Sequence, residues 1–465
     1  AEFASAVLDA GLTWIGPPPD AVRAMGSKIE SKKLMAAAGV PVLDELPADS
    51  VSAAQLPVLI KASAGGGGRG MRVVTDLGDL AAEVAAAQRE AASAFGDPTV
   101  FCERYLPTGH HVEVQVMADR RGTVWAVGER ECSIQRRHQK IIEEAPSPLV
   151  ERVAGMRDKL FAAARLAASA IGYTGAGTVE FLAADDGEFY FLEMNTRLQV
   201  EHPVTEETTG LDLVELQLDV ADGGALTAEP PATQGHSIEA RLYAEDPAKD
   251  WQPQAGTVHR FEVPGVGTEF SLLGRAGTRV DSGIVDGSVV SVFYDPMLAK
   301  VISFAPTRDR AAAILADALS RARIHGLRTN RDLLVNVLRH AAFLAGACAW
   351  RMPQVAVVGV IFAMRAWKRP AEARAAQQFL ATTLGVERHK LLHKAHRIKV
   401  LHLCQKQCLC EIMQVLICAG IQHICRAKSI RRRAKILLFQ RNHTRTKSIH
   451  RAAGRNIRRD RPRCA

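Results

Sequence analysis

Two carboxylates, Glu180 and Glu193, are placed by the sequence to bind a divalent cation. The runs 178–183 and 188–195 are typical of strands, and Asp186-Gly187 between them predicts a two-residue hairpin turn. Counting back from that turn puts Glu180 opposite Glu193, about 5 Å apart at Cβ, where like charges are destabilising. Mg²⁺ bound by both carboxylates and by substrate phosphates would relieve the repulsion. The alternative is an acidic hairpin in solvent, but the apolar neighbours of both glutamates favour a partly buried one.

Three polar residues follow Glu193. Asn195 and Arg197 lie two and four positions beyond it, so they project to the same face while the strand continues. Glu201, placed after Arg197, could act as a general base beside a cation. Each of these residues alone is a weak signal, since single charged residues usually lie on solvated surfaces.

A glycine-rich loop suggests a second site, for phosphate. The strand-like run 56–61 leads directly into residues 61–70, Lys-Ala-Ser-Ala-Gly-Gly-Gly-Gly-Arg-Gly. Glycines let backbone N–H groups turn toward an anion, and Lys61 could add a point charge. The loop lacks the Gly-Lys-Ser/Thr ending of a Walker A motif. A flexible linker is the alternative, although linkers rarely continue a buried strand.

These groups need a mixed α/β scaffold. Hydrophobic spacing and Gly/Pro punctuation predict helices at 27–39, 77–94, 151–170, 307–323 and 330–340, and further strands at 100–105 and 111–116. From about 234 to 301 the pattern becomes β-rich. Residues 1–25 are interpreted as a helix, a short strand at 12–15 and a turn.

Charge divides the 465 residues into two parts. The net charge is +9, but residues 347–465 carry 26 Lys and Arg against 4 Asp and Glu, which leaves 33 basic and 46 acidic residues before them. Seven of the nine cysteines also lie in 347–465. The two others, Cys102 and Cys132, do not make a disulfide framework, so a cytoplasmic location is predicted. The longest apolar run, 355–364, is too short for a membrane span.

The motifs together resemble the biotin carboxylase family, the ATP-grasp component of acyl-CoA carboxylases such as the acetyl- and propionyl-CoA types. The resemblance extends from about Phe3 to Gly346 and is carried by residues 191–206 (Phe-Leu-Glu-Met-Asn-Thr-Arg-Leu-Gln-Val-Glu-His-Pro-Val-Thr-Glu), 61–72, 135–140 and 235–247. It implies a remnant of a Rossmann-like domain at 1–25, an ATP-grasp domain at 26–225 with a lid subdomain at about 35–107, and a β-rich biotin carboxylase C-terminal domain at 234–346. Family members begin with further residues before the position that matches Ala1.

The resemblance also implies a role for each residue that matches a family motif. Bicarbonate would be phosphorylated by ATP, and the resulting CO₂ would be transferred to biotin on a carrier. The ATP-binding residues would be Lys28, Lys61, Gly65, Gly66, Gly67, Gly68, Glu103, Arg104, Leu106, His111, Gln135, His138 and Leu182. Two Mg²⁺ or Mn²⁺ ions would be bound by Glu180, Glu193 and Asn195. Bicarbonate would be held by Lys140, Arg197, Gln199 and Val200, with Glu201 as the base and Arg241 facing biotin.

Partners follow from the same resemblance. A biotin carboxyl carrier protein or domain and a carboxyltransferase subunit are implied, and the carboxylase body is expected to form a homodimer. The resemblance stops after Gly346. The segment 347–465 is interpreted as disordered or out of the family's frame; the alternatives are nucleic-acid binding through its arginines and zinc binding through its cysteines. An inactive truncated carboxylase is the remaining alternative for the whole chain.

Overall fold

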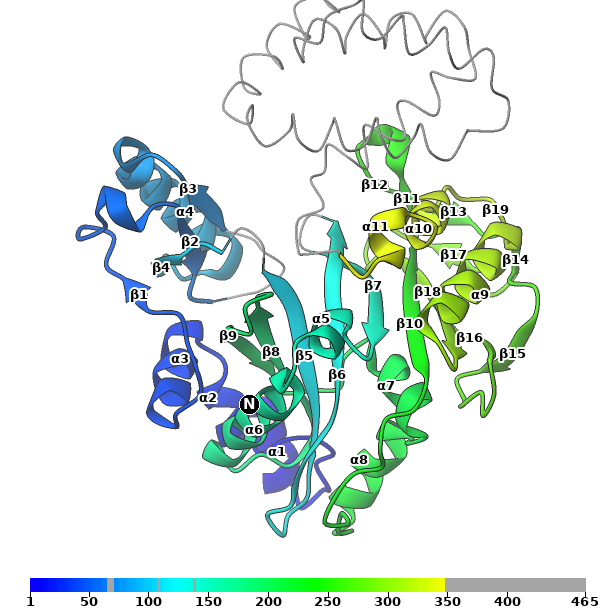
Figure 1. The fold of residues 1–465 in the computed structure, drawn as a ribbon, viewed down its shortest axis with the longest axis horizontal. Coiled ribbons are helices and arrows are strands. Elements are labelled where there is room, and N and C mark those ends of the chain that lie inside the picture. The colour runs from blue at the N-terminus through cyan, green and yellow to red at the C-terminus, as the bar shows by residue number, and fades with distance from the viewer. Residues whose placement is uncertain (65–70, 107–108, 137–138, 348–465) are drawn as a thin grey trace, which may run out of the picture. The chain divides into compact units, whose positions relative to one another are not determined.

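The computed structural model describes residues 1–64, 71–106, 109–136 and 139–347, and most of their strands fall into two sheets (Figure 1). The elements form a mixed α/β fold, as the sequence predicts. The glycines at 65–68, His138 and the basic segment from 348 lie outside the described residues.

The larger sheet carries the candidate site. Its neighbouring strands are antiparallel except for the first two, which are parallel. In spatial order the strands are β15 (Val266–Glu269), β16 (Gly277–Ser282), β18 (Met297–Ala305), β10 (His236–Tyr243), β7 (Gln139–Ala145), β6 (Val124–Arg136), β5 (His110–Ala118), β8 (Gly175–Ala183) and β9 (Phe189–Asn195). The sheet therefore continues across the predicted domain boundary near 225–234, which stays a prediction.

The two faces of this sheet differ in chemistry. On one face Val112, Val114 and Val116 of β5 pack in a hydrophobic core with α6 (Met156–Ala170) and the short α5 (Pro148–Arg152). On the other face lie α7 (His202–Thr209) and α8 (Leu213–Ala221), and the buried side chains of the sheet on this face include polar ones such as Glu113. Successive residues of a strand point to opposite faces of the sheet, so the valines of β5 point to the apolar face and Glu113 points to the polar one. Both faces of β5 are buried.

A separate sheet holds the predicted phosphate-binding strand. Its order is β1 (Glu45–Leu46), β4 (Val100–Arg104), β2 (Val58–Ala62) and β3 (Arg72–Val74). α4 (Leu80–Phe95) packs against it through Leu80 and Ala87, over Val58, Ile60 and Cys102. The predicted strand and helix here are confirmed, with α4 ending at Gly96 in the left-handed conformation that favours glycine.

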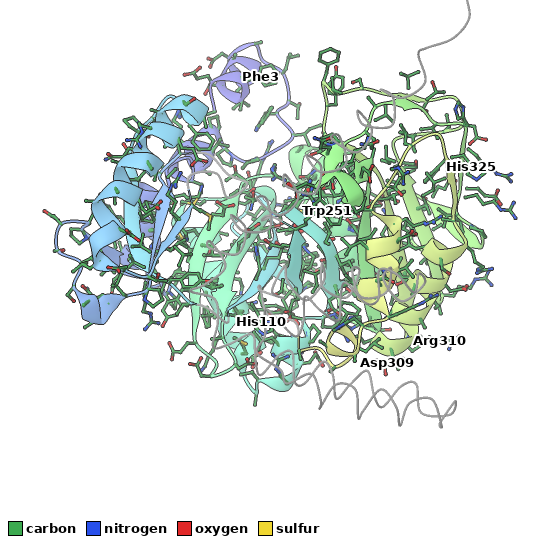
Figure 2. The ribbon with its side chains drawn as sticks, turned by 90° about the horizontal axis from the view of Figure 1, so that it is seen from above. Phe3, His110, Trp251, Asp309, Arg310 and His325 are labelled. Carbon is green, nitrogen blue, oxygen red and sulfur yellow. The ribbon has the colours of Figure 1, made fainter. Side chains whose placement is uncertain are left out.

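The first residues differ from the prediction. α1 (Glu2–Asp9) is present, but residues 12–15 form no strand, and α2 (Pro19–Ala24) replaces the expected turn. Trp14 instead donates a hydrogen bond to the Pro17 carbonyl (2.8 Å), and its ring meets edge-on that of Phe3, with 6.1 Å between centroids. Phe3 is labelled in Figure 2. The apolar run is therefore used for local packing, and Pro19 begins a helix at the position where its missing N–H costs nothing.

The remaining elements agree with the prediction apart from one break. The predicted helix 151–170 is two helices, α5 and α6, because Gly155 has a φ of +72°. α3 (Lys28–Ala37), α9 (Arg308–Arg321) and α10 (Arg331–Leu338) lie where helices were expected, and α11 (Ala341–Leu344) follows. Short strands occupy the β-rich segment and the stretch before α10: β11 (Glu245–Asp246), β12 (Gln252–Pro253), β13 (Gly256–Thr257), β14 (Arg260–Glu262), β17 (Val289–Val290) and β19 (Arg323–His325).

Gly177 in β8 gives a test of how tightly this sheet is packed. A Cβ at position 177 would lie 2.5 Å from Tyr173 Oη, which is fixed by a 2.8 Å hydrogen bond to the Ala176 carbonyl. We expect Gly177→Ala to lower the free energy of unfolding by about 1–3 kcal/mol, because the buried ring must shift. Urea unfolding with an unchanged m-value measures this. In Gly128→Ala the new Cβ would meet its nearest neighbour at 3.8 Å, so an equal loss there would contradict the steric cause.

Candidate active site

Glu180 and Glu193 face each other across β8 and β9, as predicted. The route to this register differs from the prediction. The turn is longer than two residues: Ala184 N–H donates to the Glu188 carbonyl (2.8 Å), and Gly187 has a φ of +87°. The connection therefore contains one residue more than predicted, which shifts the register by one. A β-bulge at Leu192 adds one residue on β9 and shifts the register back, so that the two glutamates are again opposite each other.

Lys28 connects the pair of Glu180 and Glu193 to the strand that precedes the glycine-rich segment. It is the first residue of α3, after the N-cap Ser27, and its Nζ lies 3.4 Å from Glu193 Oε2. Its backbone N–H donates to the carbonyl of Ser63 (3.1 Å), which is two positions before residues 65–70, a segment outside the described residues. The start of α3 therefore joins the carboxylate pair to the segment that leads into the predicted phosphate loop.

Glu180 is buried and its carboxylate is surrounded by donors. Oε1 accepts from Lys140 Nζ (3.0 Å), Asn195 Nδ2 (2.8 Å) and Gln199 Nε2 (2.8 Å), and Oε2 lies 2.9 Å from His111 Nε2. Burial alone would raise the pKa of Glu180, but Lys140 and His111 outweigh it and hold that pKa well below its usual range. Glu180 is therefore an anion whose charge is balanced by the protein's own cations.

Lys140 is the central cation of the site. Its Nζ contacts Glu113 (2.7 Å), Glu180 (3.0 Å) and Glu201 (2.6 Å). A bulge at Ile141 shifts the β6–β7 register and turns Lys140 toward this face of the sheet. Burial would lower the pKa of Lys140, but the three carboxylates raise it well above its usual range, so the ammonium stays charged.

Glu201 and Arg241 extend the cluster toward β10. Glu201 is the N-cap residue of α7. Its Oε1 accepts a hydrogen bond from Lys140 Nζ, and its Oε2 accepts one from the Arg241 guanidinium (2.9 Å). Burial would raise the pKa of Glu201, but Lys140, Arg241 and Arg130 lower it far below its usual range. The sequence suggested Arg197 as the cation beside Glu201, but the cations that contact Glu201 are Lys140 and Arg241. Arg197 is exposed because β9 ends at Asn195, and its guanidinium donates to Asn195 Oδ1 (3.3 Å).

Comparison with known proteins decides the family. Two family models match, "Carbamoyl-phosphate synthase L chain, ATP binding domain" over residues 23–229 and "Biotin carboxylase C-terminal domain" over residues 239–352. The biotin carboxylase of Halalkalibacterium halodurans is 46% identical over 357 residues, which cover 74% of this chain and 76% of that protein. The chain belongs to the biotin carboxylase family.

Larger carboxylase subunits and solved biotin carboxylase structures match as well. The mitochondrial methylcrotonoyl-CoA carboxylase subunit alpha of Dictyostelium discoideum is 46% identical over 356 residues, and the chain spans about half the length of this and similar curated relatives (50% here). A Campylobacter jejuni biotin carboxylase solved as a β,γ-ATP complex aligns with a TM-score of 0.70 at 39% identity, covering 75% of this chain and 78% of that one. A Hydrogenobacter thermophilus biotin carboxylase domain dimer, solved with MgADP and bicarbonate, aligns with a TM-score of 0.69 at 39% identity, covering 75% of this chain and 77% of that one. These solved structures confirm the predicted ATP-grasp type of α/β fold.

The residues that the family resemblance assigns to nucleotide fall into two groups. On the smaller sheet, Glu103 is buried and its carboxylate pairs with Lys32 Nζ (2.7 Å) and with Lys61. On the larger sheet, Gln135 Nε2 lies 3.1 Å from His111 Nδ1. The other described members are Lys28, which lies beside Glu193, Leu182, which is 4% exposed, Leu106, which is half-buried, and Arg104, whose guanidinium contacts the Tyr190 hydroxyl at 3.3 Å. Their roles stay predictions.

Sequence reasoning missed three buried charges in this biotin carboxylase site. Arg130 of β6 donates to Glu113 (2.6 Å), and Glu143 of β7 accepts from Arg241 Nε (2.5 Å). Strands β6 and β7 were not predicted, so their charged residues had no element to place them. The signal for Glu113 was present, since His111, Glu113 and Gln115 alternate with valines, but a polar alternation usually indicates a solvated face.

The donor set around Glu180 and Glu193 fits a hard divalent cation. Both side chains offer carboxylate oxygens, and Asn195, which hydrogen-bonds to Glu180, adds an amide oxygen. Like charges are opposed on neighbouring strands, with Lys28 and Lys140 as the nearest balancing charges. Mg²⁺ or Mn²⁺ therefore suits these residues better than zinc, whose sites favour His and Cys.

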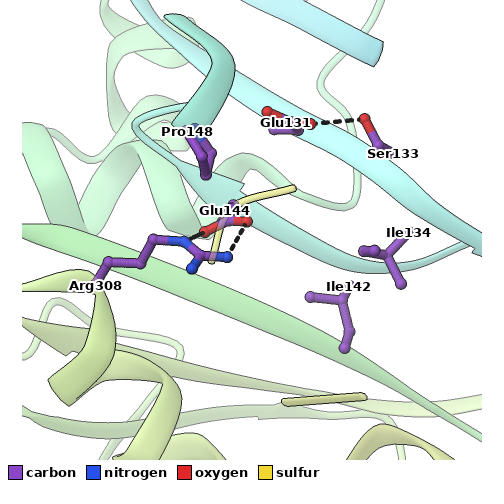
Figure 3. A pocket seen from close by; sticks show the side chains of 8 residues that line it. Glu131, Ser133, Ile134, Ile142, Glu144, Pro148 and Arg308 are labelled. Atoms are coloured by element: carbon purple, nitrogen blue, oxygen red, sulfur yellow. Dashed lines mark hydrogen bonds and ion pairs between the residues drawn. The ribbon is translucent and has the colours of Figure 1, made fainter. Parts of the chain in front are cut away.

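A small pocket lies on the opposite face of the sheet from this site (Figure 3). Its polar lining includes Glu131 and Glu144, which face each other across β6 and β7. Glu144 is held by Arg308 at 2.6 and 2.9 Å, as the dashed lines show. Because Glu143 and Glu144 are consecutive strand residues, they point to opposite faces, so this pocket is separate from the candidate active site.

Proposed function

We propose that this chain catalyses the ATP- and bicarbonate-dependent carboxylation of biotin. One observation carries the proposal: Glu201 is held between Lys140 and Arg241, next to the opposed carboxylates of Glu180 and Glu193. Lys140 contacts both Glu201 and Glu180, so the proposed base, two cations and one carboxylate of the proposed metal-binding pair lie in one network of direct contacts. The second carboxylate, Glu193, is opposite Glu180 in the strand register. Among the described residues, no helix combines the length and apolar composition that a membrane span needs, and the cytoplasmic location stays a prediction.

The proposed chemistry begins with bicarbonate. Its oxygen attacks the γ-phosphorus of ATP, the bond to the β-phosphate oxygen breaks, and Glu201 accepts the proton, giving carboxyphosphate and ADP. The metal, when bound to Glu180, Glu193 and Asn195, would neutralise charge on the phosphates. Lys140 would hold the bicarbonate oxygens, together with Gln199 and the Val200 backbone; in the structure the Val200 carbonyl accepts from Lys300 (3.0 Å).

Substrate binding would also change the strength of the base. Lys140 and Arg241 keep the pKa of Glu201 low while they contact it directly. When these two cations turn toward a bound anion, their hold on Glu201 weakens and its pKa rises. Glu201 would therefore become a stronger base only when bicarbonate is present.

The second half of the proposed reaction involves Arg241. Carboxyphosphate breaks down to CO₂ and phosphate, and the phosphate takes the N1′ proton of biotin. Arg241 stabilises the negative charge on the ureido oxygen while N1′ attacks CO₂. Biotin would be presented by a carrier protein or domain, and the product would be passed to a carboxyltransferase. The dimeric state of the Hydrogenobacter thermophilus domain supports proposing a homodimer here.

Fixation of labelled bicarbonate tests this function directly. The full chain is incubated with ATP, Mg²⁺, labelled bicarbonate and free biotin, and carboxybiotin and ADP are measured together. We expect equal amounts of both products and loss of both when biotin, bicarbonate or ATP is omitted. ATP cleavage that continues without biotin or bicarbonate, or an absence of carboxybiotin, would sink the proposal.

Glu193→Gln tests the proposed metal site. The substitution removes one carboxylate charge but keeps the shape of the side chain, which is 37% exposed and so tolerates the change. We expect the Mg²⁺ concentration for half-maximal ATP cleavage to rise by about tenfold or more, equivalent to about 1.4 kcal/mol of lost binding. Glu188→Gln, an exposed carboxylate at the start of the same hairpin arm, is the matched control. An equal effect at both positions would argue for general surface charge.

A further inference from the structure

Behind Arg241, two glutamates oppose each other in the interior of the sheet. Glu143 of β7 and Glu239 of β10 are directly paired in the antiparallel register, and both are 0% exposed. Opposed side chains in such a pair lie about 5 Å apart at Cβ. Two ionised carboxylates at this separation, without water around them, would repel each other strongly. At least one of the two must therefore be balanced by a cation or be uncharged.

Glu143 has a cationic partner. Its Oε1 accepts the Nε–H of Arg241 at 2.5 Å, while the NH2 group of the same guanidinium binds Glu201. Arg241 is thus held from two sides, by Glu143 through Nε and by Glu201 through a terminal nitrogen. Burial raises the pKa of Glu143 to about 7 even though Arg241 opposes this shift, so its charge depends on the balance of its neighbours.

Glu239 has no such partner among the described residues. Neither of its carboxylate oxygens makes a hydrogen bond there, although both are buried. The nearby cations are engaged elsewhere: Arg241 binds Glu143 and Glu201, and Lys300 donates to the Val200 carbonyl (3.0 Å) and lies 3.3 Å from Asp281.

A small apolar cluster borders Glu239. On β18 the paired residue is Ile302, which packs with Ala145 of β7 and Val204 of α7 in a small hydrophobic cluster. An ionised carboxylate next to this cluster would be both desolvated and unpaired, which is the most unfavourable state for a buried charge. Burial, with Glu143 and Glu201 nearby, raises the pKa of Glu239 well above its usual range despite Lys300 and Arg241.

We propose that Glu239 is a protonated, uncharged carboxyl group, and that its neutrality allows Glu143 to act as the anion that positions Arg241 for biotin. The proposal rests on the proposed function for the role of Arg241. If Glu239 were ionised, it would repel Glu143 and compete with it for the guanidinium. With Glu239 neutral, Arg241 keeps its Nε contact to Glu143, and its terminal nitrogens remain directed to Glu201 and the substrate side. Glu143 is then a positioning residue.

The charged groups that face this pair come from every neighbouring element. They are Lys140 and Glu143 on β7, Arg241 on β10, Lys300 on β18, Arg279 and Asp281 on β16, and Glu201, His202 and Glu206 at α7. Arg279 and Asp281 pair with each other (2.8 Å), and burial lowers the pKa of His202 to about 4, so it is neutral near pH 7. Of the opposed pair, Glu143 is the member whose pKa is raised to about 7, so its charge changes near neutral pH.

The protonation of Glu239 has a consequence for stability. A carboxyl that is protonated when folded and ionised when unfolded takes up a proton on folding, so stability falls as pH rises above its unfolded pKa. Glu239→Gln keeps the shape and neutrality of the acid but cannot ionise. We expect this variant to be more stable than the wild type at about pH 8, with the advantage shrinking as the pH falls toward about 4, where the unfolded carboxyl of Glu239 also becomes protonated.

Glu144→Gln is the matched control. Glu144 is the adjacent buried glutamate on β7, but it is held as an anion: burial raises its pKa, and its hydrogen bonds to His236 (2.9 Å) and Arg308 outweigh this and lower it. A lowered carboxyl pKa contributes stability above the unfolded pKa, so Glu144→Gln should be less stable than the wild type at about pH 8. The two substitutions, identical in chemistry, are therefore expected to change stability in opposite directions.

Two measurements decide the proposal without any substrate. Thermal unfolding of the full chain from about pH 5 to pH 8 should give the opposite signs described above. Infrared difference spectra at about pH 8 should show the carbonyl stretch of a protonated carboxylic acid in the wild type that disappears in Glu239→Gln. Destabilisation of Glu239→Gln, its failure to fold, or an unchanged infrared spectrum would each overturn the proposal. Both tests hold even if the wild type does not carboxylate biotin.

Glu143→Gln tests the positioning role separately. Gln at position 143 can still accept a hydrogen bond from Arg241 Nε but carries no negative charge, so this contact should weaken and Arg241 should move toward Glu201. We expect kcat/KM for free biotin to fall by about tenfold or more, with less than about a threefold change in the KM for ATP. The acidic limb of the biotin kcat/KM profile that falls near pH 7 in the wild type should also be absent. Equal changes in the biotin and ATP parameters would indicate a general structural defect and would contradict this role.

Discussion

Replacing Glu201 by Gln is expected to lower kcat for biotin carboxylation by about 10²–10⁴-fold while leaving the protein folded. Gln has the shape of Glu and can occupy the same place at the start of α7, but it cannot take the bicarbonate proton. Lys140 and Arg241 should still be charged in this variant, because other carboxylates also raise their pKa values. Glu113 does so for Lys140, and Glu143 does so for Arg241. The loss should therefore appear in kcat more than in the KM for ATP. Steady-state measurement of carboxybiotin formation gives both parameters.

The matched control for this prediction is Glu207→Gln. Glu207 lies on the same helix and is also buried, but its carboxylate accepts from the Leu273 N–H (3.2 Å) and contacts Arg279 (3.4 Å), away from Lys140. We expect less than about a threefold change in kcat for this variant. If Glu201→Gln retains most of the wild-type rate, or if both variants lose activity equally, Glu201 is not the base.

The opposition of Glu180 and Glu193 shows what local sequence can predict and where it fails. Strand patterns and a Gly-containing turn were enough to place the two glutamates on facing strands. The expected two-residue turn was wrong, because Asp185, Asp186 and Gly187 together make the connection, and the bulge at Leu192 compensates. Two errors of one residue cancelled. Bulges depend on how the neighbouring strands pack, so the sequence of the hairpin alone did not reveal this one.

The neighbours of Glu201 show the limit for contacts distant in sequence. Lys140 lies 61 residues before Glu201 and Arg241 lies 40 residues after it. No local pattern relates these positions, and local spacing indicated Arg197 instead. The family resemblance grouped Lys140, Glu201 and Arg241 in one site, and the sheet order β10-β7-β6-β5-β8-β9 explains how they meet. The alternation of β5 was similarly ambiguous, because a polar face looks the same in sequence whether water or another charge covers it.

Arg130 is the clearest example of a residue that only the three-dimensional structure identifies. It is 0% exposed, and its guanidinium spans four elements. The contacts are to Glu113 (2.6 Å), Gln115 (2.7 Å), Gln199 (2.9 Å), Thr205 (3.0 Å) and Thr178 (3.2 Å). A single Arg in a strand of unremarkable sequence gave no hint of this. Arg130 contacts Glu113, one of the three carboxylates that Lys140 contacts, and it is linked to a second, Glu180, through Gln199.

Arg130→Met is therefore expected to lower the free energy of unfolding by about 3–5 kcal/mol, the cost of leaving a buried ionic partner uncompensated. Met fills a similar volume, so the loss reports the charge and hydrogen bonds rather than a cavity. Glu113 would keep its contact with Lys140 (2.7 Å), with His111 Nε2 farther away at 3.9 Å. Adding Glu113→Gln to Arg130→Met should restore part of the loss, because the unpaired charge is then removed. Urea unfolding of the single and double variants measures both effects.

The control for Arg130 is an arginine whose ion pair lies in solvent. Arg321 on α9 pairs with Asp317 one turn earlier, and both side chains are 57% exposed. Arg321→Met should change the free energy of unfolding by less than about 1 kcal/mol, as is usual for exposed pairs. A loss at Arg130 no larger than at Arg321 would mean that the buried network is not what holds β5, β6, β8 and α7 together. If adding Glu113→Gln to Arg130→Met does not recover any stability, then the unpaired charge of Glu113 is not the cause of the loss.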